Sequence, residues 1–123
     1  MKVLCFGNPL LEEDSLAIEL ADELKIKGFE FIKTNSVDDI LNTKEDFIIM
    51  DVAKGIDKVT IIKDINKLIS NKIYSMHDFD LNFFLKLMKE KGEIDKIMIL
   101  ALPMNQEKQE IKKEVLTLLP SLL

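Results

Sequence analysis

The feature that most constrains this fold is a regular alternation of short apolar segments with amphipathic ones along the chain. Apolar runs rich in β-forming residues predict strands, and apolar residues at helical spacing predict helices between them. The predicted strands are 2–7, 29–34, 46–51, 58–64 and 96–103. The predicted helices are 13–28, 36–42, 78–92 and the segment that follows residue 103. This alternation predicts a three-layer α/β/α fold, with helices on both faces of a twisted, mostly parallel sheet of about five strands.

Length and composition indicate one soluble domain over residues 1–123. The net charge is −5 and no basic block is present, so we expect no nucleic-acid partner. No apolar run approaches the length of a membrane span, and the start of the chain does not have the pattern of a signal peptide. Cys5, the single cysteine, lies in the first apolar run and is expected to be a small buried side chain. These features predict a cytoplasmic protein without a membrane partner, and nothing among them indicates the oligomeric state.

Acidic residues gather where the first predicted helix begins. The strand 2–7 runs into Gly7 and Asn8, and Glu12, Glu13 and Asp14 follow. Carboxylates in a first helical turn interact favourably with the helix dipole. The pattern alone therefore leaves open whether these residues only stabilise the helix or also bind a ligand.

Two further residues stand close to the ends of predicted elements. Asp51 directly follows the apolar run "FIIM", and His77, the only histidine, precedes the helix 78–92. If the first and third strands are neighbours, Asp14 and Asp51 lie at the same edge of the sheet, where ligands bind in such folds. Two carboxylates and one imidazole suit a divalent transition metal. The three residues are scattered, however, so their spacing alone is weak evidence for a site.

Four segments, taken in order, resemble the motifs of the hydrogenase maturation endopeptidases. The segments are "FGNPLLEEDSLAIELADEL", "FIIMDVAKG", "YSMHDFDLNFFLKLMKEKG" and "IDKIMILALPM". The resemblance covers nearly the whole chain. The chain differs from the family in having "KTNSVDDIL" where an Asp-Gly-Gly segment is common, and in a shortened loop after the last strand. It therefore resembles a short, divergent member.

The resemblance implies an activity and a site. Members of this family remove the C-terminal extension of a nickel-iron hydrogenase large-subunit precursor once its nickel is loaded. The metal-contacting positions of the family match Asp14, Asp51 and His77, and the implied catalytic residues are Asp14 and Asp51. Gly7 and Asn8 would shape the loop that lets the substrate approach. The nickel is carried by the substrate, and another divalent transition metal could occupy the same ligands in the free protein.

Two alternatives remain open at the level of sequence. A response-regulator-like receiver domain would use Asp51 as phosphoacceptor, with Glu12 and Glu13 holding magnesium. Against it, Gly7-Asn8-Pro9 lengthens the first loop, and no lysine follows "ILALP". A metal-binding maturation accessory protein without catalysis would use the same three ligands as the peptidase.

Overall fold

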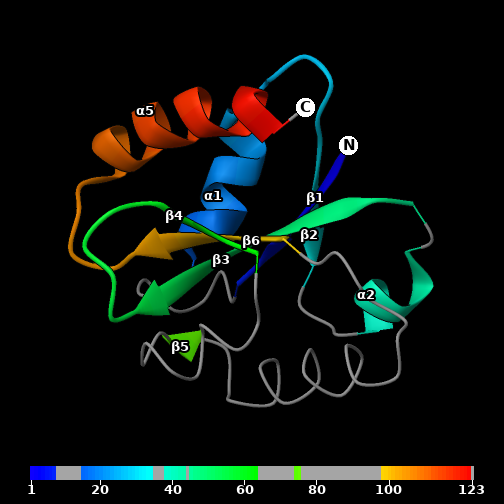
Figure 1. Ribbon diagram of the computed structural model, residues 1–123, viewed down its shortest axis with the longest axis horizontal. Coiled ribbons are helices and arrows are strands. Elements are labelled where there is room, and N and C mark those ends of the chain that lie inside the picture. Colours follow the sequence, from blue (N-terminus) through cyan, green and yellow to red (C-terminus); the bar gives the residue numbers. More distant parts are fainter. Residues whose placement is uncertain (8–14, 35–37, 44, 64–73, 76–97, 123) are drawn as a thin grey trace.

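The computed structural model describes residues 1–7, 15–34, 38–43, 45–63, 74–75 and 98–122, and in it a sheet lies between helices (Figure 1). The strands are β1 (Lys2–Phe6), β2 (Glu30–Thr34), β3 (Phe47–Lys54), β4 (Thr60–Ile62), β5 (Tyr74–Ser75) and β6 (Met98–Pro103). The helices are α1 (Leu16–Glu23), α2 (Asp38–Asn42) and α5 (Lys108–Leu118), followed by the 3-10 helix η2 (Leu119–Leu122). The predicted helix 78–92 lies outside the described residues. None of the described helices is long and apolar enough to cross a membrane.

The described strands form one sheet of order β2-β1-β3-β6-β4, with β5 paired to β3 beside this path. Strands β2, β1, β3 and β6 are mutually parallel, while β4 pairs antiparallel with β6 at one edge. The predicted α/β class and the parallel sheet are thus confirmed. The predicted neighbour relation between the first and third strands is also confirmed.

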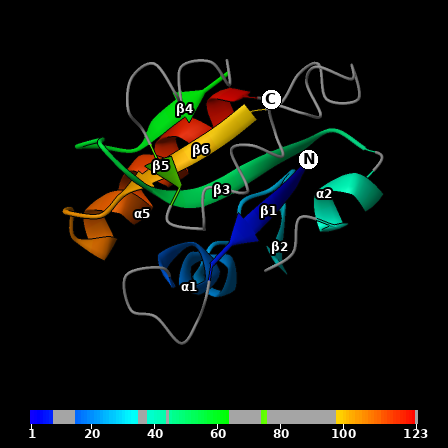
Figure 2. The same ribbon diagram turned by 90° about the horizontal axis from the view of Figure 1, so that it is seen from below.

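The main core lies between the sheet and the two longest described helices. Helices α1 and α5 cover the same face of the sheet (Figures 1 and 2). Because side chains alternate along a strand, every second residue of the central strands points into this layer. The buried side chains of this core are Val3, Cys5, Ala17, Leu20, Leu24, Ile48, Met50, Val52, Val59, Leu100, Leu102, Ile111, Val115 and Leu119. Cys5 is therefore a core side chain, as the sequence predicted.

Helix α1 is shorter than the predicted helix 13–28. It begins at Leu16, after Ser15 at the N-cap position, and the extended backbone of Leu24 ends it. Leu24 remains buried in the core. A turn then leads into β2, in which the N–H of Phe29 donates a 3.1 Å hydrogen bond to the carbonyl of Ile26. Gly28 occupies this turn with φ of 91°, a value that favours glycine, so its role is in the turn and not at the helix end.

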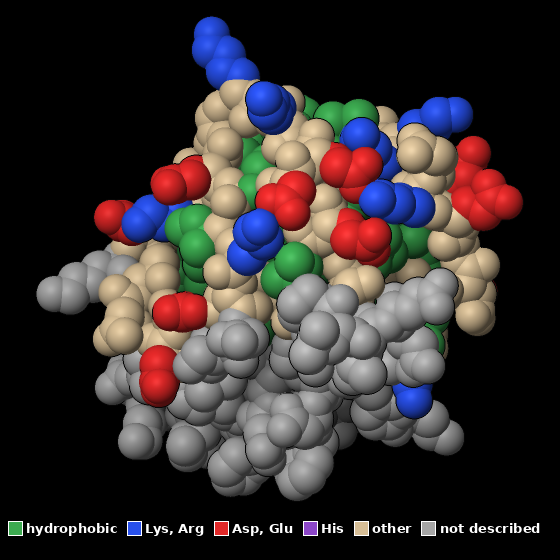
Figure 3. Space-filling view, turned by 180° about the vertical axis from the view of Figure 1, so that it is seen from behind, with side chains coloured by type: hydrophobic (Ala, Val, Ile, Leu, Met, Phe, Trp, Pro, Cys, Tyr) green, Lys and Arg blue, Asp and Glu red, His purple; other side chains and the backbone are tan. Residues whose placement is uncertain are grey.

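Charged side chains link α1 to α5 above the core. Lys108 of α5 forms ion pairs with Glu23 and, at 3.7 Å, with Glu19 of α1. Lys112 adds a longer contact of 4.0 Å to Glu23. Lysine and acidic side chains are interspersed over the described part of the molecular surface in Figure 3. The two helices that cover the core are therefore held together by charge as well as by packing.

Candidate functional site

The connections of β1 and β2 leave the sheet on opposite faces. Helix α1 follows β1 and leads to β2, whereas α2 follows β2 and leads to β3, on the other side of the sheet (Figure 1). With the order β2-β1-β3, strand order therefore reverses between β1 and β3. In parallel α/β sheets a ligand binds at this point, beyond the carboxyl ends of the strands. Gly7, which directly follows β1, is buried here.

Asp51 lies in β3 at this point, with its side chain almost completely buried. Its exposed fraction is 3%, and its strand partner on β6 is Ala101. Its sequence neighbours Met50 and Val52 belong to the core beneath α1 and α5. Alternation along the strand therefore directs Asp51 to the opposite face of the sheet.

The prediction that the third strand ends at Asp51 was wrong. Strand β3 continues to Lys54, because β6 stays paired with it as far as Ala53. Asp51 nevertheless lies immediately beyond Met50, the last residue of β3 that pairs with β1. Asp51 therefore lies inside its own strand but just beyond the stretch of β3 that pairs with β1.

Strands β1 and β5 approach the same edge of β3 from opposite ends. Strand β6 occupies the other edge of β3, including Ala53, so β5 must pair with Ala53 on the β1 side. Pairing with β1 stops at Met50, and pairing with β5 involves Ala53 and Lys54. Along this edge of β3, the pairing with β1 thus ends one residue before Asp51, and the pairing with β5 begins one residue after Val52. We call this interruption the β3 gap.

The carboxylate of Asp51 takes a backbone donor at the β3 gap. The N–H of Val52 donates a hydrogen bond of 2.9 Å to Asp51 Oδ1. A buried carboxylate lowers the stability of a fold unless hydrogen bonds replace its lost hydration. The Val52 N–H supplies one such bond. The gap therefore accommodates a charged side chain within an otherwise apolar sheet.

The direction of β5 matters for the predicted histidine. Its antiparallel pairs are Lys54 with Tyr74 and Ala53 with Ser75. Along β5 the chain therefore moves past β3 toward Asp51. His77 follows two residues after Ser75 and lies outside the described residues.

Of the other predicted site residues, Asn8, Glu12, Glu13 and Asp14 also lie outside the described part of the chain. Asp14 directly precedes Ser15, which is itself buried and whose hydroxyl donates a 3.2 Å hydrogen bond to Glu19 Oε2. Within the described ranges, no group of three or more His, Cys, Asp or Glu side chains could hold a metal ion. Since Asp14 and His77 are not among them, this finding does not test the predicted triad.

The sequence analysis missed a polar contact at the end of β2. Thr34, the last residue of that strand, is 6% exposed, and its hydroxyl donates a hydrogen bond to Asp39 Oδ2. The hydroxyl of Thr43 also donates to the backbone carbonyl of Asp39, at 2.6 Å. A threonine at the end of a strand, followed by aspartates where a short helix begins, is the signal that could have indicated this contact. This contact attaches α2 to the carboxyl end of β2, and Asp51 lies toward the same end of the parallel strands.

Cys5 is not a candidate nucleophile. Its side chain is fully buried, and burial raises the pKa of the thiol from 9.0 to about 12. Only the thiolate is strongly nucleophilic. At neutral pH the thiol therefore remains protonated inside the core.

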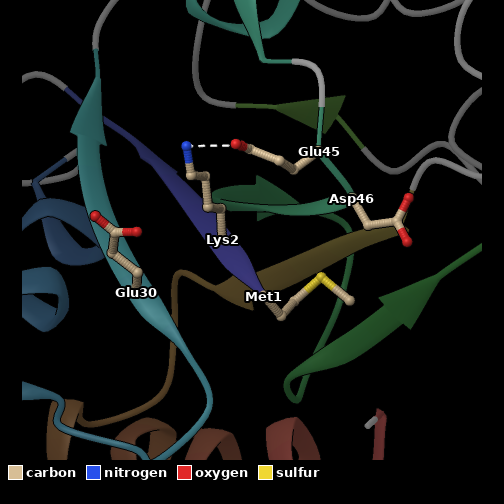
Figure 4. Close-up of a pocket in the computed structure, with 5 residues that line it drawn as sticks. All are labelled: Met1, Lys2, Glu30, Glu45 and Asp46. Carbon is tan, nitrogen blue, oxygen red and sulfur yellow. Dashed lines mark ion pairs between the residues drawn. The ribbon is translucent and has the colours of Figure 1, made fainter.

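A hollow of about 420 Å³ lies at the other end of the parallel strands from Asp51. Met1, Lys2, Glu30, Glu45 and Asp46 line it (Figure 4). Lys2 Nζ is 2.7 Å from Glu45 Oε2, and this hydrogen bond raises the pKa of Lys2 and lowers that of Glu45. The hollow lies at the amino ends of β1, β2 and β3, away from the carboxyl ends where sites form in parallel sheets. We therefore place the candidate site at Asp51.

Comparison with known proteins identifies a family. The sequence profile of HycI, hydrogenase maturation protease, matches residues 31–122. No curated protein sequence matches the chain significantly.

Solved structures share the fold. The [NiFe] hydrogenase maturation protease HybD from Thermococcus kodakarensis is 17% identical, with a TM-score of 0.70 over 98% of this chain and 97% of that one. The hydrogenase 3 maturation protease is 20% identical, with a TM-score of 0.68 over 94% and 86%. HybD from E. coli is 13% identical, with a TM-score of 0.62 over 98% and 90%.

Proposed function

This chain belongs to the hydrogenase maturation protease family, whose members are peptidases, and from that premise we propose that it cleaves the C-terminal extension from a hydrogenase large-subunit precursor. The cleavage would depend on nickel already bound in the precursor. Two carboxylates and a histidine, Asp14, Asp51 and His77, would contact that nickel.

The observation that carries this proposal is the burial of Asp51 at the β3 gap. An apolar residue at this position of a central strand would be easier to bury. The carboxylate instead lies where strand order reverses, at the edge that serves as a ligand site in this class of fold. A charge kept at such a place, at a cost in stability, suggests a functional role.

The register of β5 supports the participation of His77. Two residues of extended chain reach about 7 Å, so His77 must lie within that range of Ser75 along the chain. If the antiparallel pairing continued past Ser75, residue 77 would stand opposite Asp51, as residue 75 stands opposite Ala53. The imidazole of His77 would then reach the β3 gap from the β5 side.

The position of α1 supports the participation of Asp14. Asp14 is one residue before Ser15, and α1 begins near the end of the sheet at which β1 ends. Its carboxylate would approach the β3 gap from the β1 side, opposite to His77. Two carboxylate oxygens and one imidazole nitrogen match the ligand preferences of Ni²⁺ and of other divalent transition metals. In the free protein, another such ion could take the same position.

This arrangement would couple recognition to cleavage. Nickel held by the precursor would be shared with Asp14, Asp51 and His77, so a precursor without nickel would bind poorly. A carboxylate near the bound ion can accept a proton from a water molecule, and the water oxygen can then attack a peptide carbonyl. Gly7, without a side chain, and Asn8 would let the precursor backbone approach the gap.

Mass spectrometry of a nickel-loaded hydrogenase precursor, incubated with this protein, tests the proposal. We expect the precursor to lose a C-terminal peptide, and the nickel-free precursor to remain intact. Asp51→Asn, Asp14→Asn and His77→Ala should each abolish the shortening. Glu110→Gln on the exposed surface of α5 is the matched control and should cleave normally.

Other outcomes would point elsewhere. A protein that retains the nickel-loaded precursor without shortening it would be an accessory binder, and the peptidase proposal would fail. Cleavage that persists in both Asp51→Asn and His77→Ala would remove the proposed site. The receiver-domain alternative finds no support in the comparisons.

A further inference from the structure

Strand β2 forms one edge of the described sheet, where it pairs only with β1 (Figure 2). Backbone N–H and C=O groups on the outer side of an edge strand can form hydrogen bonds with another strand. Two apolar residues at the centre of β2, Phe31 and Ile32, are partly exposed. Within the described part of the chain, this edge is therefore suited to receive an extended segment.

A hollow of about 420 Å³ lies between the amino end of β2 and the end of α1. We call it the α1–β2 hollow, and its lining is Ala21, Leu24, Lys25, Ile26, Lys27, Phe29 and Phe31. Apart from its two lysines, the lining residues are apolar. Phe29 and Phe31 pack against the core but remain partly exposed. The hollow thus offers apolar contact area directly beside the strand edge.

The two lysines give the α1–β2 hollow a positively charged rim. Lys25 and Lys27 are exposed, and neither forms an ion pair with another described residue. The lining contains no acidic residue that could neutralise them. Their charge is therefore available to a partner.

The acidic residues nearest to these lysines in sequence interact elsewhere. Asp22 pairs with Lys33 at 2.8 Å, and Glu23 pairs with Lys108 of α5. Because side chains alternate along a strand, Glu30 points away from the α1 face. It lines the separate hollow shown in Figure 4. The fold thus leaves the positive rim uncompensated.

We propose that the β2 edge and the α1–β2 hollow together bind an extended acidic segment of the hydrogenase precursor, away from the bond that is cleaved. This inference rests on the proposed function, which supplies the precursor as the partner. The segment would add a strand beside β2 through backbone hydrogen bonds. One of its apolar side chains would enter the hollow, and its acidic side chains would approach Lys25 and Lys27.

Three features of this surface together favour an acidic polypeptide. A free anion would use the lysines, but it would use neither the apolar lining nor the strand edge. A basic segment would meet two lysines and no acidic residue in the lining. The whole chain has a net charge of −5, so an acidic segment is repelled by much of the molecule and attracted to this rim.

The position of the hollow relative to Asp51 fits a protein substrate. Strands β1, β2 and β3 are parallel, and the hollow lies at the amino end of β2 while Asp51 lies toward the carboxyl ends. A protein substrate can contact both places at once, and each contact raises the local concentration of the other. A contact that is the same before and during cleavage lowers KM and leaves kcat unchanged.

Steady-state cleavage of the nickel-loaded precursor, followed by mass spectrometry, tests the proposal. Lys25→Glu/Lys27→Glu should raise KM about tenfold and change kcat by less than about twofold. The difference in KM should shrink in high salt, because the lysines are exposed. Lys63→Glu/Lys113→Glu is the matched control, since it makes the same change in net charge at exposed lysines outside the hollow, and it should leave KM unchanged. An unchanged KM in Lys25→Glu/Lys27→Glu would overturn the proposal.

Amide hydrogen exchange tests the contact of the strand edge separately. The Asp51→Asn protein, which should bind the nickel-loaded precursor without cleaving it, is compared alone and with saturating precursor. We expect slower exchange across Glu30–Thr34 in the complex. Exchange in β2 that does not respond to the precursor would contradict the added strand.

The two proposals fail in distinguishable ways. If the wild-type protein does not shorten the precursor, the peptidase proposal fails, and equilibrium binding of the fluorescently labelled precursor tests the contact instead. Binding should then weaken at least about fivefold in Lys25→Glu/Lys27→Glu and remain unchanged in the control. Normal cleavage with an unaltered KM in Lys25→Glu/Lys27→Glu would support the peptidase and remove this contact. A precursor that is neither cleaved nor bound would remove both.

Discussion

The backbone N–H of Val52 donates a 2.9 Å hydrogen bond to the carboxylate of Asp51, the residue directly before it. Both residues lie at the β3 gap, where pairing with β1 stops at Met50 and pairing with β5 starts at Ala53. The carboxylate most important to the proposed site is therefore buried with a backbone donor directly beside it.

Substitution of Asp51 should separate stability from activity. In Asp51→Asn the amide oxygen can still accept the Val52 N–H, so the free energy of unfolding should change by no more than about 1 kcal/mol. Asp51→Leu leaves the buried Val52 N–H without its acceptor, so it should lower the free energy of unfolding by about 1–3 kcal/mol. Both variants should lose precursor cleavage. Urea denaturation and mass spectrometry of the precursor measure the two properties.

The control for Asp51 is Asp57→Asn, a change at an exposed carboxylate on the turn before β4. It should alter neither stability nor cleavage. Retention of cleavage by Asp51→Leu would show that the buried carboxylate has no catalytic role.

Lys108 should contribute to stability through α1. Lys108→Met removes its ion pairs with Glu23 and Glu19, and should lower the free energy of unfolding by about 0.5–1 kcal/mol. Urea denaturation should show this loss shrinking in high salt. Lys113→Met is matched to it, because its only described partner, Glu110, is 4.0 Å away and both side chains are exposed. Equal losses in the two variants would argue against a link between α1 and α5.

Cys5 should report on opening of the core. With a pKa of about 12 in the folded protein, its thiol should react with iodoacetamide at pH 8 about a thousandfold more slowly than in the urea-unfolded chain. Burial keeps the folded thiol protonated, whereas the unfolded thiol ionises above its ordinary pKa of 9.0. The free energy of unfolding should therefore fall as pH rises from about 9 toward 12.

The pH-dependent part of this prediction has a simple control. Cys5→Ala removes the thiol, and the difference between its pH profile and that of the wild type isolates the contribution of Cys5. Rapid labelling of the folded wild-type protein at pH 8 would contradict the buried position.

The Lys2–Glu45 ion pair should be visible by NMR titration. Glu45→Gln should return the raised pKa of Lys2 toward 10.5, and Lys2→Met should return the lowered pKa of Glu45 toward 4.5. The contribution of Glu45 to stability is present above pH 4.5 and is lost as pH falls through its lower folded pKa. That of Lys2 is present below pH 10.5 and is lost as pH rises through its higher folded pKa.

Asp46→Asn is the control for this pair, because Asp46 lines the same hollow without pairing with Lys2. It should leave the pKa of Lys2 where it is. A Lys2 pKa that responds more to Asp46→Asn than to Glu45→Gln would contradict the assigned contact.

Much of the architecture could be predicted from the sequence, because the central strands are apolar on both sides. Runs such as "KVLCF" and "FIIM" fit only strands covered on both faces, and the intervening helices imply parallel connections. Boundaries were less predictable. The periodicity of α1 continues beyond Leu24, but the turn required at Gly28 ends the helix before it. A long-range constraint prevailed there over a local pattern.

The surroundings of Asp51 could not be predicted, because they depend on register between distant segments. Only the pairing of β3 with β1, β5 and β6 determines that Asp51 lies beside the end of β1 and inside β3. The contact between Thr34 and Asp39 depends likewise on how α2 meets the sheet. For Asp14 and His77 the sequence provides the candidates, and their participation stays a prediction.

The end-to-end placement of β1 and β5 along one side of β3 makes the length of the β3 gap a matter of strand length. Two more residues of pairing at the tip of either strand would close the gap, and one fewer would lengthen it. Insertions or deletions near Gly7 or Ser75 would therefore change the backbone beside Asp51 while the hydrophobic layer beneath α1 and α5 stays the same.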